Sequence, residues 1–435
     1  MGAPLRRYRR SAVFFVAVLL VWGVLMTNLL RVRSSGLAVV SLAVVFSAAG
    51  FAQAVAPAAV TRTQYFPDTS DGIHLEMIFN YNVGDPQSEE GVVDMVWGSN
   101  FATQPPGVYN TAYIPYSVDN FTNSVDWYQA NHPDWLEYLC DQKTLAFEFG
   151  TTTLAPLDFA NPAVRAYQWA SWVDAPLAQG FGGIAVDTMD LTNDWQRCGH
   201  FDTSGTWVQQ YTGESDDAKF RRDVLGWEVA TYQHVHAYSN TATMQVNVTY
   251  QFGEPKADNL KLMTTTDLLL DERGFTNWGS AARHVSTPAE WEGIVGALDY
   301  VQSKGICYTT NGEEPGLSLQ LSEADRQWVL ANYLVIKNDC TYVYMTGITN
   351  GQQGYGRLIV FPEYSIAIGH ALRARIKTQG VWERKFSGGL ALVNPYSATA
   401  VVTLPPGRYV DVKGNSVGPT VTMERQTGLV LLRAQ

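Results

Sequence analysis

GFGGIAVDTMDLTN, residues 180–193, is the stretch that decides the fold. A glycine-rich turn leads into the short apolar run Gly183 to Asp187, and another acid, Asp190, follows soon after it. Buried strands of parallel sheets are continuous apolar runs, and in a barrel of such strands the functional side chains lie where the strands end. The stretch therefore predicts an inner strand that carries Asp187 to the open end of a barrel.

Side-chain alternation along this strand predicts the direction of its acid. The residues at positions 183, 185 and 187 are small or polar, whereas Ile184 and Val186 are bulky and suit a layer of helices. Asp187 is therefore expected to face the mouth of the barrel.

A second acidic strand end is expected if this interpretation is right. The run 268–270 consists of three leucines and is closed by Asp271 and Glu272. Both faces of this run contain leucine, so alternation leaves open which of the two acids faces the mouth.

Eight runs have the length and composition of strands, and helical patterns separate most of them. These runs are residues 73–82, 92–99, 111–116, 183–187, 243–250, 267–272, 306–310 and 340–345. Asn161-Pro162, Thr287-Pro288 and Ser322 are N-terminal capping signals for helices between the strands. The alternation predicts an α/β fold, with a parallel sheet closed into a (β/α)₈ TIM barrel. An open doubly wound sheet is disfavoured, because the Gly182-Gly183 turn precedes a strand and not a helix.

The pattern changes near Gly380 to brief strands joined by turns. These strands are residues 386–394, 398–404, 408–412, 420–423 and 429–433. They predict a small all-β, sandwich-like domain that caps the barrel structurally; a separate sugar-binding role is the alternative. The expected organisation is a targeting segment over 1–54, a linker over 55–72, a catalytic barrel over 73–379 and a β-domain over 380–435.

The charge of the chain is unevenly distributed. The six charged residues before Ala54 are all arginines, so the remainder carries 24 of the 30 basic and all 41 acidic residues, a net charge of −17. Such a body repels nucleic acids and polyanionic glycans, and both are therefore poor candidates for a partner.

The first 54 residues contain two apolar runs, Ser11 to Leu30 and Gly36 to Ala52. The second ends in Ala52-Gln53-Ala54, a site of the type that signal peptidase cleaves, which predicts an exported chain. Translation from Met26 would leave only this signal peptide. In the alternative, the first run is a transmembrane segment that holds the protein at the cell surface.

Four cysteines lie in the presumed exported body: Cys140, Cys198, Cys307 and Cys340. They allow two disulfides in three connectivities, although Cys307 and Cys340 also suit buried free thiols. Their spacing is not that of a metal site, and no metal or cofactor is expected.

The acidic strand ends match the chemistry of glycosidic bond cleavage, which uses one protonated and one ionised carboxyl group. Polar residues near these and other strand ends complete the expected substrate site: Asn80, Asp190, Asn247, Asp271 and Asn311. Tryptophans pack against the apolar faces of sugar rings, and the candidates are Trp97, Trp195 and Trp278. Taken singly, each of these residues is more often structural; for example, Asp190 suits a turn.

Several segments in order resemble a known family. They are His132-Pro133-Asp134-Trp135, residues 157–165 (LDFANPAVR), residues 180–187 and Asp271-Glu272. The series resembles glycoside hydrolase barrels related to the polygalactosaminidase-like and α-galactosidase-like (β/α)₈ enzymes. Residues 392–395 and 428–432 are similar to the β-domain that follows such barrels.

The resemblance covers most of the chain after residue 73. It implies that acids on the fourth and sixth strands perform the chemistry, with Asp187 as nucleophile or base and Glu272 as acid. The usual Gly-Phe-Asp-Gly turn of the fourth strand is Gly-Phe-Gly-Gly here.

The sequence thus predicts an exported glycosidase that hydrolyses a neutral or cationic carbohydrate substrate. A catalytically inactive barrel that binds cell-surface polysaccharide through its aromatic residues is the alternative. A barrel enzyme of another class, such as a lyase or a phosphodiesterase, is a third possibility. The phosphodiesterase is disfavoured, because no histidine pair or basic cluster closes the strands.

Overall fold

The computed structural model describes residues 66–119, 121–248, 256–276, 287–315, 321–349 and 352–434. Residues 59–435 form one compact unit. The expected targeting segment lies outside the described residues. Within the described ranges, no helix is both long enough and apolar enough to cross a membrane.

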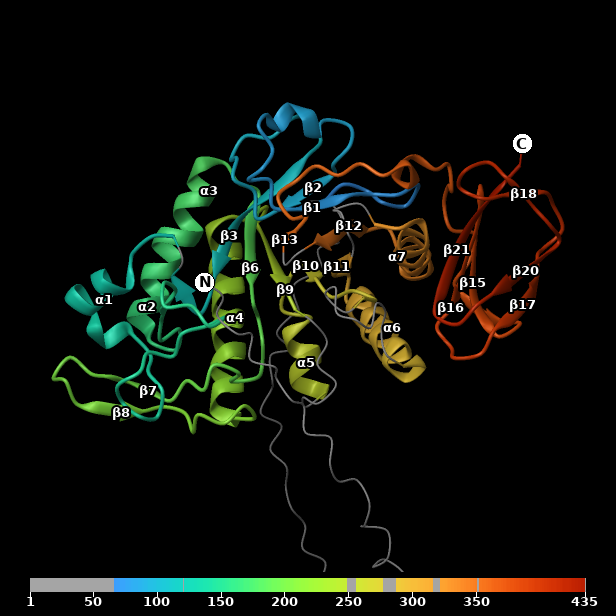
Figure 1. Ribbon diagram of the computed structural model, residues 1–435. Helices are drawn as coiled ribbons and strands as arrows, with labels where there is room; N and C mark the ends of the chain where they lie inside the picture. Colours follow the sequence, from blue (N-terminus) through green and yellow to red (C-terminus); the bar gives the residue numbers. More distant parts are fainter. Residues whose placement is uncertain are drawn as a thin grey trace, which may run out of the picture. The chain divides into compact units, whose positions relative to one another are not determined.

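The central sheet consists of eight parallel strands and a short antiparallel strand, β13 (Gln352–Gln353), that pairs with the last of them (Figure 1). In sheet order the parallel strands are β1 (Glu76–Ile78), β2 (Met95–Trp97), β3 (Tyr109–Pro115), β6 (Gly183–Asp187), β9 (Thr243–Asn247), β10 (Leu268–Asp271), β11 (Cys307–Pro315) and β12 (Thr341–Thr349). A parallel bridge from Leu75 to Val343 joins the last strand to the first, and the Val343 amide donates to the His74 carbonyl at 2.9 Å. The sheet is therefore a nearly closed barrel, which confirms the predicted fold class and all eight strands.

Helices cover the strands from β3 onward. They are α1 (Val125–Asn131), α2 (Pro162–Gln168), α3 (Ala175–Gln179), α4 (Ala218–Tyr238), α5 (Lys256–Leu262), α6 (Pro288–Ser303) and α7 (Glu323–Ile336), with a π-helical segment, Trp169–Asp174, between α2 and α3. The predicted caps are present: the side chains of Asn161, Thr287 and Ser322 accept hydrogen bonds from amides in the first turns of α2, α6 and α7.

The first three strands depart from the regular pattern. Residues 79–94 and 98–108 are all described, and they contain only the short 3₁₀ helix η2 (Pro86–Glu89). The first strand is also shorter than its alternation predicted, because Phe79 has a φ of 57° and interrupts the extended backbone. This half of the mouth is therefore built from loops.

The C-terminal region forms antiparallel sheets. A six-stranded sheet contains β14 (Ile376–Thr378), β15 (Val381–Phe386), β16 (Gly389–Asn394), β21 (Thr427–Arg433), β18 (Tyr409–Val410) and β19 (Ser416–Val417), and a second sheet pairs β17 (Ala400–Thr403) with β20 (Thr420–Met423). Apolar residues from both sheets, including Leu390, Leu392, Val402 and Met423, share one core. The two layers confirm the sandwich-like fold, while the domain boundary at Gly380 stays a prediction.

One predicted strand of this region is wrong. Residues 386–394 are not one strand, because Phe386 pairs with Gly389 across a tight turn between β15 and β16. A Cβ on Gly388 would lie 2.1 Å from the Ala367 carbonyl oxygen, so the turn requires glycine there.

The six-stranded sheet packs on α7 (Figure 1). The Val430 amide donates to Gln327 Oε1 at 2.9 Å, and the Arg384 guanidinium donates to carbonyls at the C-terminal end of α7. Backbone and helix-end groups that would otherwise be unpaired are thus satisfied across this contact.

All four cysteines are paired, as Cys140–Cys198 and Cys307–Cys340. The expectation of two disulfides is confirmed, and the alternative of free thiols at Cys307 and Cys340 is wrong.

Candidate active site

Three polar side chains meet at the ends of three neighbouring strands. Asp187 ends β6, Asn247 ends β9 and Glu272 directly follows β10. On the same strands, Ala185 and Leu270 belong to the cluster inside the barrel. Because strand side chains alternate, Asp187 and Glu272 share this inner face and point toward the mouth.

Asn247 joins the two acids. Its Nδ2 amide group donates to Asp187 Oδ1 and to Glu272 Oε2, both at 2.9 Å. The two hydrogens of a planar amide diverge by about 120°, so oxygens that accept both of them lie about 5 Å apart. The two acids are therefore held at a fixed, short separation by one neutral group.

Asp187 is surrounded by hydrogen-bond donors. Besides Asn247, the Thr188 amide donates to Oδ1 at 2.8 Å and the Tyr113 hydroxyl donates to Oδ2 at 3.2 Å. Burial raises the pKa of Asp187, and these three hydrogen bonds oppose that shift because they stabilise the carboxylate.

Glu272 has a different environment. Burial raises its pKa, and the neighbouring charge of Asp187 raises it further, against hydrogen bonds from Asn247 and Tyr355. The Tyr355 hydroxyl in turn accepts from Asn311 Nδ2 at 2.8 Å, so Asn311 acts on Glu272 through Tyr355. Since Asp187 has the more numerous donors, Glu272 is the group that keeps a proton when the pair carries one.

Asp271 lies on the opposite face from Glu272. Its Oδ1 accepts from the Gly274 amide at 3.0 Å and its Oδ2 from the Tyr308 hydroxyl at 3.2 Å. Burial raises the pKa of Asp271 to about 7. The structure thus separates the two acids that sequence alternation left open, and Asp271 closes a turn behind the strand.

Two other predicted site residues are enclosed by protein. Asn80 is fully buried, donates to Glu89 Oε1 and accepts from the Asn100 amide, so that it ties together the loops after β1 and β2. Trp97 is only 1% exposed and lies inside the barrel against the rings of Phe79 and Tyr113. Both residues support the mouth from below.

Two further predicted residues, Asp190 and Trp195, fall on the rim. Asp190 accepts from the amide and hydroxyl of Thr192 at 2.9 and 2.7 Å, which is the turn that its sequence context suggested. Trp195 packs its ring 4.9 Å from that of Phe149, an exposed residue. Trp278 lies outside the described residues.

A second group of acids lies in the loops that follow β3 and β6. Arg197 is completely buried and donates to both Glu137 and Glu148, the latter at 2.6 Å. Burial alone would lower the pKa of Arg197, but the charges of the two glutamates outweigh this effect and raise it. Burial raises the pKa of Glu137 to about 7 despite the opposing charge of Arg197.

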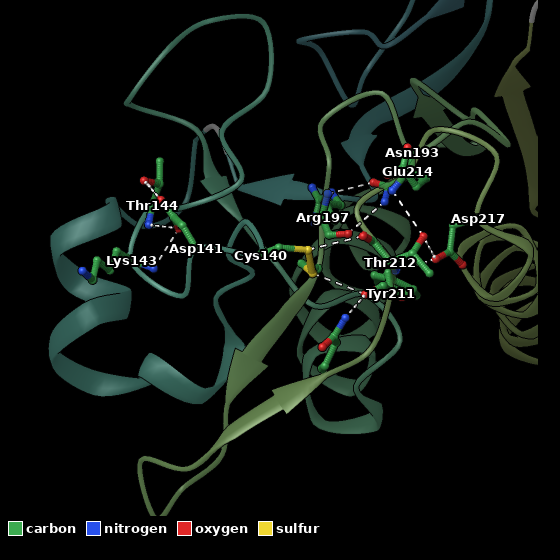
Figure 2. The surroundings of a disulfide bond; sticks show 12 residues. Cys140, Asp141, Lys143, Thr144, Asn193, Arg197, Tyr211, Thr212, Glu214 and Asp217 are labelled. Carbon is green, nitrogen blue, oxygen red and sulfur yellow. Dashed lines mark hydrogen bonds between the residues drawn. A yellow bond between two sulfur atoms is a disulfide. The ribbon is translucent and has the colours of Figure 1, made fainter.

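The disulfide Cys140–Cys198 fastens the same two loops (Figure 2). Cys198 adjoins Arg197, whose backbone amide and carbonyl both bond to the side chain of Asn193. Asp217 accepts from the Thr212 amide and hydroxyl and caps α4. The loops beside Asp187 are therefore held by a covalent bond and by buried charges.

Sequence reasoning missed Tyr113 and Tyr355. Tyr113 lies inside β3 and not at its end, two residues before Pro115, which pairs with Asp187. The alternation of β3 could have indicated that Tyr113 faces inward, whereas the predicted strand-end residue Tyr116 packs outside against Phe159. Tyr355 lies in an irregular segment after β13 (Gln352–Gln353), which has no such signal.

The described residues contain no group of three or more histidine, cysteine, aspartate or glutamate side chains arranged to hold a metal ion. The chemistry available at the mouth is that of two carboxyl groups, a bridging amide and two phenols.

No family model and no curated protein matches the sequence. Among solved structures, the chain is similar to the glycoside hydrolase domain of PelA from Pseudomonas aeruginosa, with 15% identity, coverage of 65% of this chain and 96% of that chain, and a TM-score of 0.40. It is also similar to Eubacterium rectale Amy13B, with 9% identity, 87% and 99% coverage and a TM-score of 0.46. A GH31 dextranase from Flavobacterium johnsoniae shows 10% identity, 85% and 52% coverage and a TM-score of 0.42. At such distances, activity has to be inferred from the side chains of this chain.

Proposed function

We propose that this protein is a glycosidase that hydrolyses O-glycosidic bonds with Asp187 and Glu272. The observation that carries the proposal is the Asn247 amide, which bonds to both carboxyl groups at 2.9 Å. A separation of about 5 Å is that of retaining glycosidases, whereas inverting enzymes need roughly 6.5–9.5 Å to admit a water molecule. The hydrolysis should therefore retain the anomeric configuration.

The unequal environments of the two acids support their roles. Three donors stabilise the Asp187 carboxylate, which suits a nucleophile, and the charge of Asp187 favours a proton on Glu272, which suits a general acid. Glu272 donates its proton to the glycosidic oxygen while an oxygen of Asp187 attacks the anomeric carbon. The bond from that carbon to the glycosidic oxygen breaks, and the leaving sugar departs as an alcohol.

The second step restores the enzyme. The Glu272 carboxylate takes a proton from water, and the water oxygen attacks the anomeric carbon of the glycosyl ester. Asp187 departs as a carboxylate and Glu272 is protonated again. All protons and electron pairs are supplied by the two acids, the substrate and water.

The charge and the disulfides of the chain support the proposed substrate class and location. A net charge of −17 after the arginine-rich segment favours a neutral or cationic glycan over a polyanionic one. Two disulfides favour an oxidising compartment, in agreement with export from the cytoplasm. Export is part of this proposal. The targeting segment is either cleaved, which releases the protein, or retained, which anchors the protein at the cell surface.

Replacement of the nucleophile tests the proposal. The purified chain is incubated with dextran, soluble starch and glycol chitosan, with hyaluronan as polyanionic control, and reducing ends are measured. Asp187→Asn should lower turnover by at least about 10⁴-fold, because the covalent step is lost while the shape of the side chain is kept. Asp271→Asn, a neighbouring acid on the outer face, is the matched control and should keep activity within a few fold.

Binding of the same polymers to Asp187→Asn, measured by affinity electrophoresis, separates the alternatives. Retained binding without turnover, together with an active unmodified chain, supports the glycosidase. An unmodified chain that binds a polymer without any turnover would instead identify a polysaccharide-binding barrel, and an unaffected Asp187→Asn variant would remove Asp187 from the mechanism.

A further inference from the structure

Four aromatic rings form a continuous strip across the mouth, over the loops and strands from β1 to β3. The ring centroids are 5.8 Å apart for Tyr81 and Phe79, 5.4 Å for Phe79 and Tyr113, and 6.4 Å for Tyr113 and Phe121. The two end rings are open to solvent, with Tyr81 52% and Phe121 56% exposed. Apolar rings exposed at such a position, next to the candidate acids, indicate a binding surface.

The local backbone conformation positions Phe79 and Tyr81, the first half of the strip. Phe79 adopts a φ of 57°, a strained value for a residue with a bulky side chain. A Cβ on Gly98 would lie 2.7 Å from the Phe79 ring, and one on Gly356 would lie 2.7 Å from the Tyr81 ring. Both glycines have positive φ, so these close contacts and conformations require glycine.

The other end of the strip is carried by a rigid loop. Buried Asp119 accepts hydrogen bonds from the amides of Phe121, Thr122 and Asn123 at 3.0, 2.8 and 2.9 Å. The Tyr128 hydroxyl donates to the same carboxylate at 2.8 Å. Phe121 is thus exposed on a loop whose backbone has little freedom, and a preorganised ring loses little entropy when a ligand packs against it.

The two halves of the strip are connected to different acids, one directly and the other through Tyr355. Tyr113, which packs against Phe121, donates to Asp187. The ring centroids of Tyr355 and Phe79 are 6.3 Å apart, and Phe79 in turn packs against Tyr81. Tyr355 also forms a hydrogen bond with Glu272. One exposed end is therefore linked to the nucleophile through Tyr113, and the other is linked to the acid through Phe79 and Tyr355.

We propose that the strip binds successive sugar rings of one polysaccharide chain on both sides of the bond that is cleaved, with Phe121 under the glycosyl side and Tyr81 under the leaving-group side. This inference rests on the proposed function, because the acid protonates the leaving group and the nucleophile attacks the glycosyl side. The centroid spacings are comparable to the length of one pyranose unit, and the apolar faces of pyranoses pack on aromatic rings. The substrate class is a polymer of neutral or cationic pyranoses, cleaved within the chain.

Two single variants of the full chain test the strip, with the polymer that is hydrolysed best among dextran, soluble starch and glycol chitosan. Tyr81→Ala should lower kcat/KM on the polymer roughly 10-fold and leave hydrolysis of a dinitrophenyl glycoside of the same sugar within about 2-fold. Phe121→Ala should lower kcat/KM on the polymer by a similar factor and raise KM for a dinitrophenyl oligosaccharide of that sugar. Tyr238→Ala, which removes a 46% exposed tyrosine from the C-terminal end of α4, is the control and should change neither value.

Product sizes and binding complete the test. The unmodified chain should release oligosaccharides from the start of the reaction, and sole release of single sugars would overturn cleavage within the chain. Equal effects of Tyr81→Ala on polymer and on aryl glycoside, or no effect of either variant, would overturn the strip. Affinity electrophoresis of both variants in the Asp187→Asn background measures whether the strip binds polymer in the absence of turnover. This measurement distinguishes a failure of the strip proposal from a failure of the proposed function.

Discussion

Two pairs of acids lie near each other in this protein, and each pair shares one bridging side chain. At the mouth, Asp187 and Glu272 both accept from the neutral amide of Asn247. In the loops beside it, Glu137 and Glu148 both accept from the cationic Arg197. The first pair is partly open to solvent, whereas the second is buried.

The charge of the bridge determines what each pair can do. The Arg197 guanidinium neutralises the charge of one acid in a site without solvent, where burial also favours a proton on Glu137. An amide holds two carboxyl groups at a fixed distance without neutralising either, and their mutual repulsion favours one shared proton. The first arrangement serves structure, and the second is suited to proton transfer and nucleophilic attack.

Removal of the acid from the mouth pair should have the largest effect. Glu272→Gln should lower turnover of a polysaccharide by about 10²–10⁴-fold, because the leaving oxygen is no longer protonated. A dinitrophenyl glycoside should be affected far less in its first step, because dinitrophenolate leaves without a proton. Kinetics on the two substrates measure this difference.

The stability of Glu272→Gln sharpens the comparison. Burial and the charge of Asp187 disfavour the ionised form of Glu272 in the folded state, and a glutamine cannot ionise. The variant should therefore unfold at the same or a higher denaturant concentration at neutral pH. A clear loss of stability would mean that the mouth pair, like the Arg197 cluster, is a structural element.

Removal of the bridge from the buried cluster should have the next largest effect. Arg197→Met leaves two buried carboxylates without a cation and should destabilise the protein by about 3–5 kcal/mol, measured by denaturant unfolding. Arg165→Met removes a partly exposed arginine that lies over the Trp169 ring, and should cost no more than about 1 kcal/mol.

A charge-neutral combination tests the cause of that loss, even if Arg197→Met does not fold. The triple variant Arg197→Met, Glu137→Gln, Glu148→Gln should recover much of the stability, because no unpaired charge stays buried. Triple and single variants of equal stability would show that packing, and not charge, gives Arg197 its role.

The contrast between the two pairs also explains what could be predicted from sequence. The common position of Asp187, Asn247 and Glu272 could be predicted, because each lies where a strand ends and the ends of parallel strands meet at one rim. Alternation did not separate Asp271 from Glu272, since the deciding contact is with Tyr308 on the next strand. The choice of Glu272 over Asp271 came from the resemblance to glycoside hydrolase barrels.

The Arg197 cluster had no comparable signal. Its partners are 60 and 49 residues away in sequence, in irregular loops where no periodicity fixes the direction of a side chain. Phe79 was missed for a related reason: a φ of 57° ends the strand in the middle of a regular alternating pattern. Periodic elements could be predicted, and contacts formed only by tertiary packing could not.

The disulfide beside the Arg197 cluster should make a smaller contribution. Cys140→Ser with Cys198→Ser should destabilise the protein by about 2–4 kcal/mol, because a closed loop spanning 58 residues no longer restricts the unfolded chain. Denaturant unfolding of the double variant and of the unmodified, oxidised protein measures the difference, since Cys307–Cys340 stays intact in both. If the cluster fixes these loops independently, turnover of the double variant stays within a few fold; a large loss of turnover would show that the disulfide positions Asp187.

A carboxyl group with no bridge at all completes the comparison, and a change of one pH unit should alter stability less than the removal of Arg197 or of the disulfide. Glu76 is buried, accepts a hydrogen bond from Thr309, and burial raises its pKa from the usual 4.5 to about 8. The folded state then binds this proton more tightly than the unfolded state, so stability is full below pH 4.5 and is lost as the pH rises toward 8. The loss is at most about 1.4 kcal/mol per pH unit.

Glu76→Gln cannot ionise, so its stability relative to the unmodified chain should increase steadily between pH 5 and about pH 8, as measured by urea unfolding. The exposed Glu90→Gln is the control, and parallel stability curves for the unmodified chain and Glu76→Gln would show that Glu76 is ionised in the folded protein without cost.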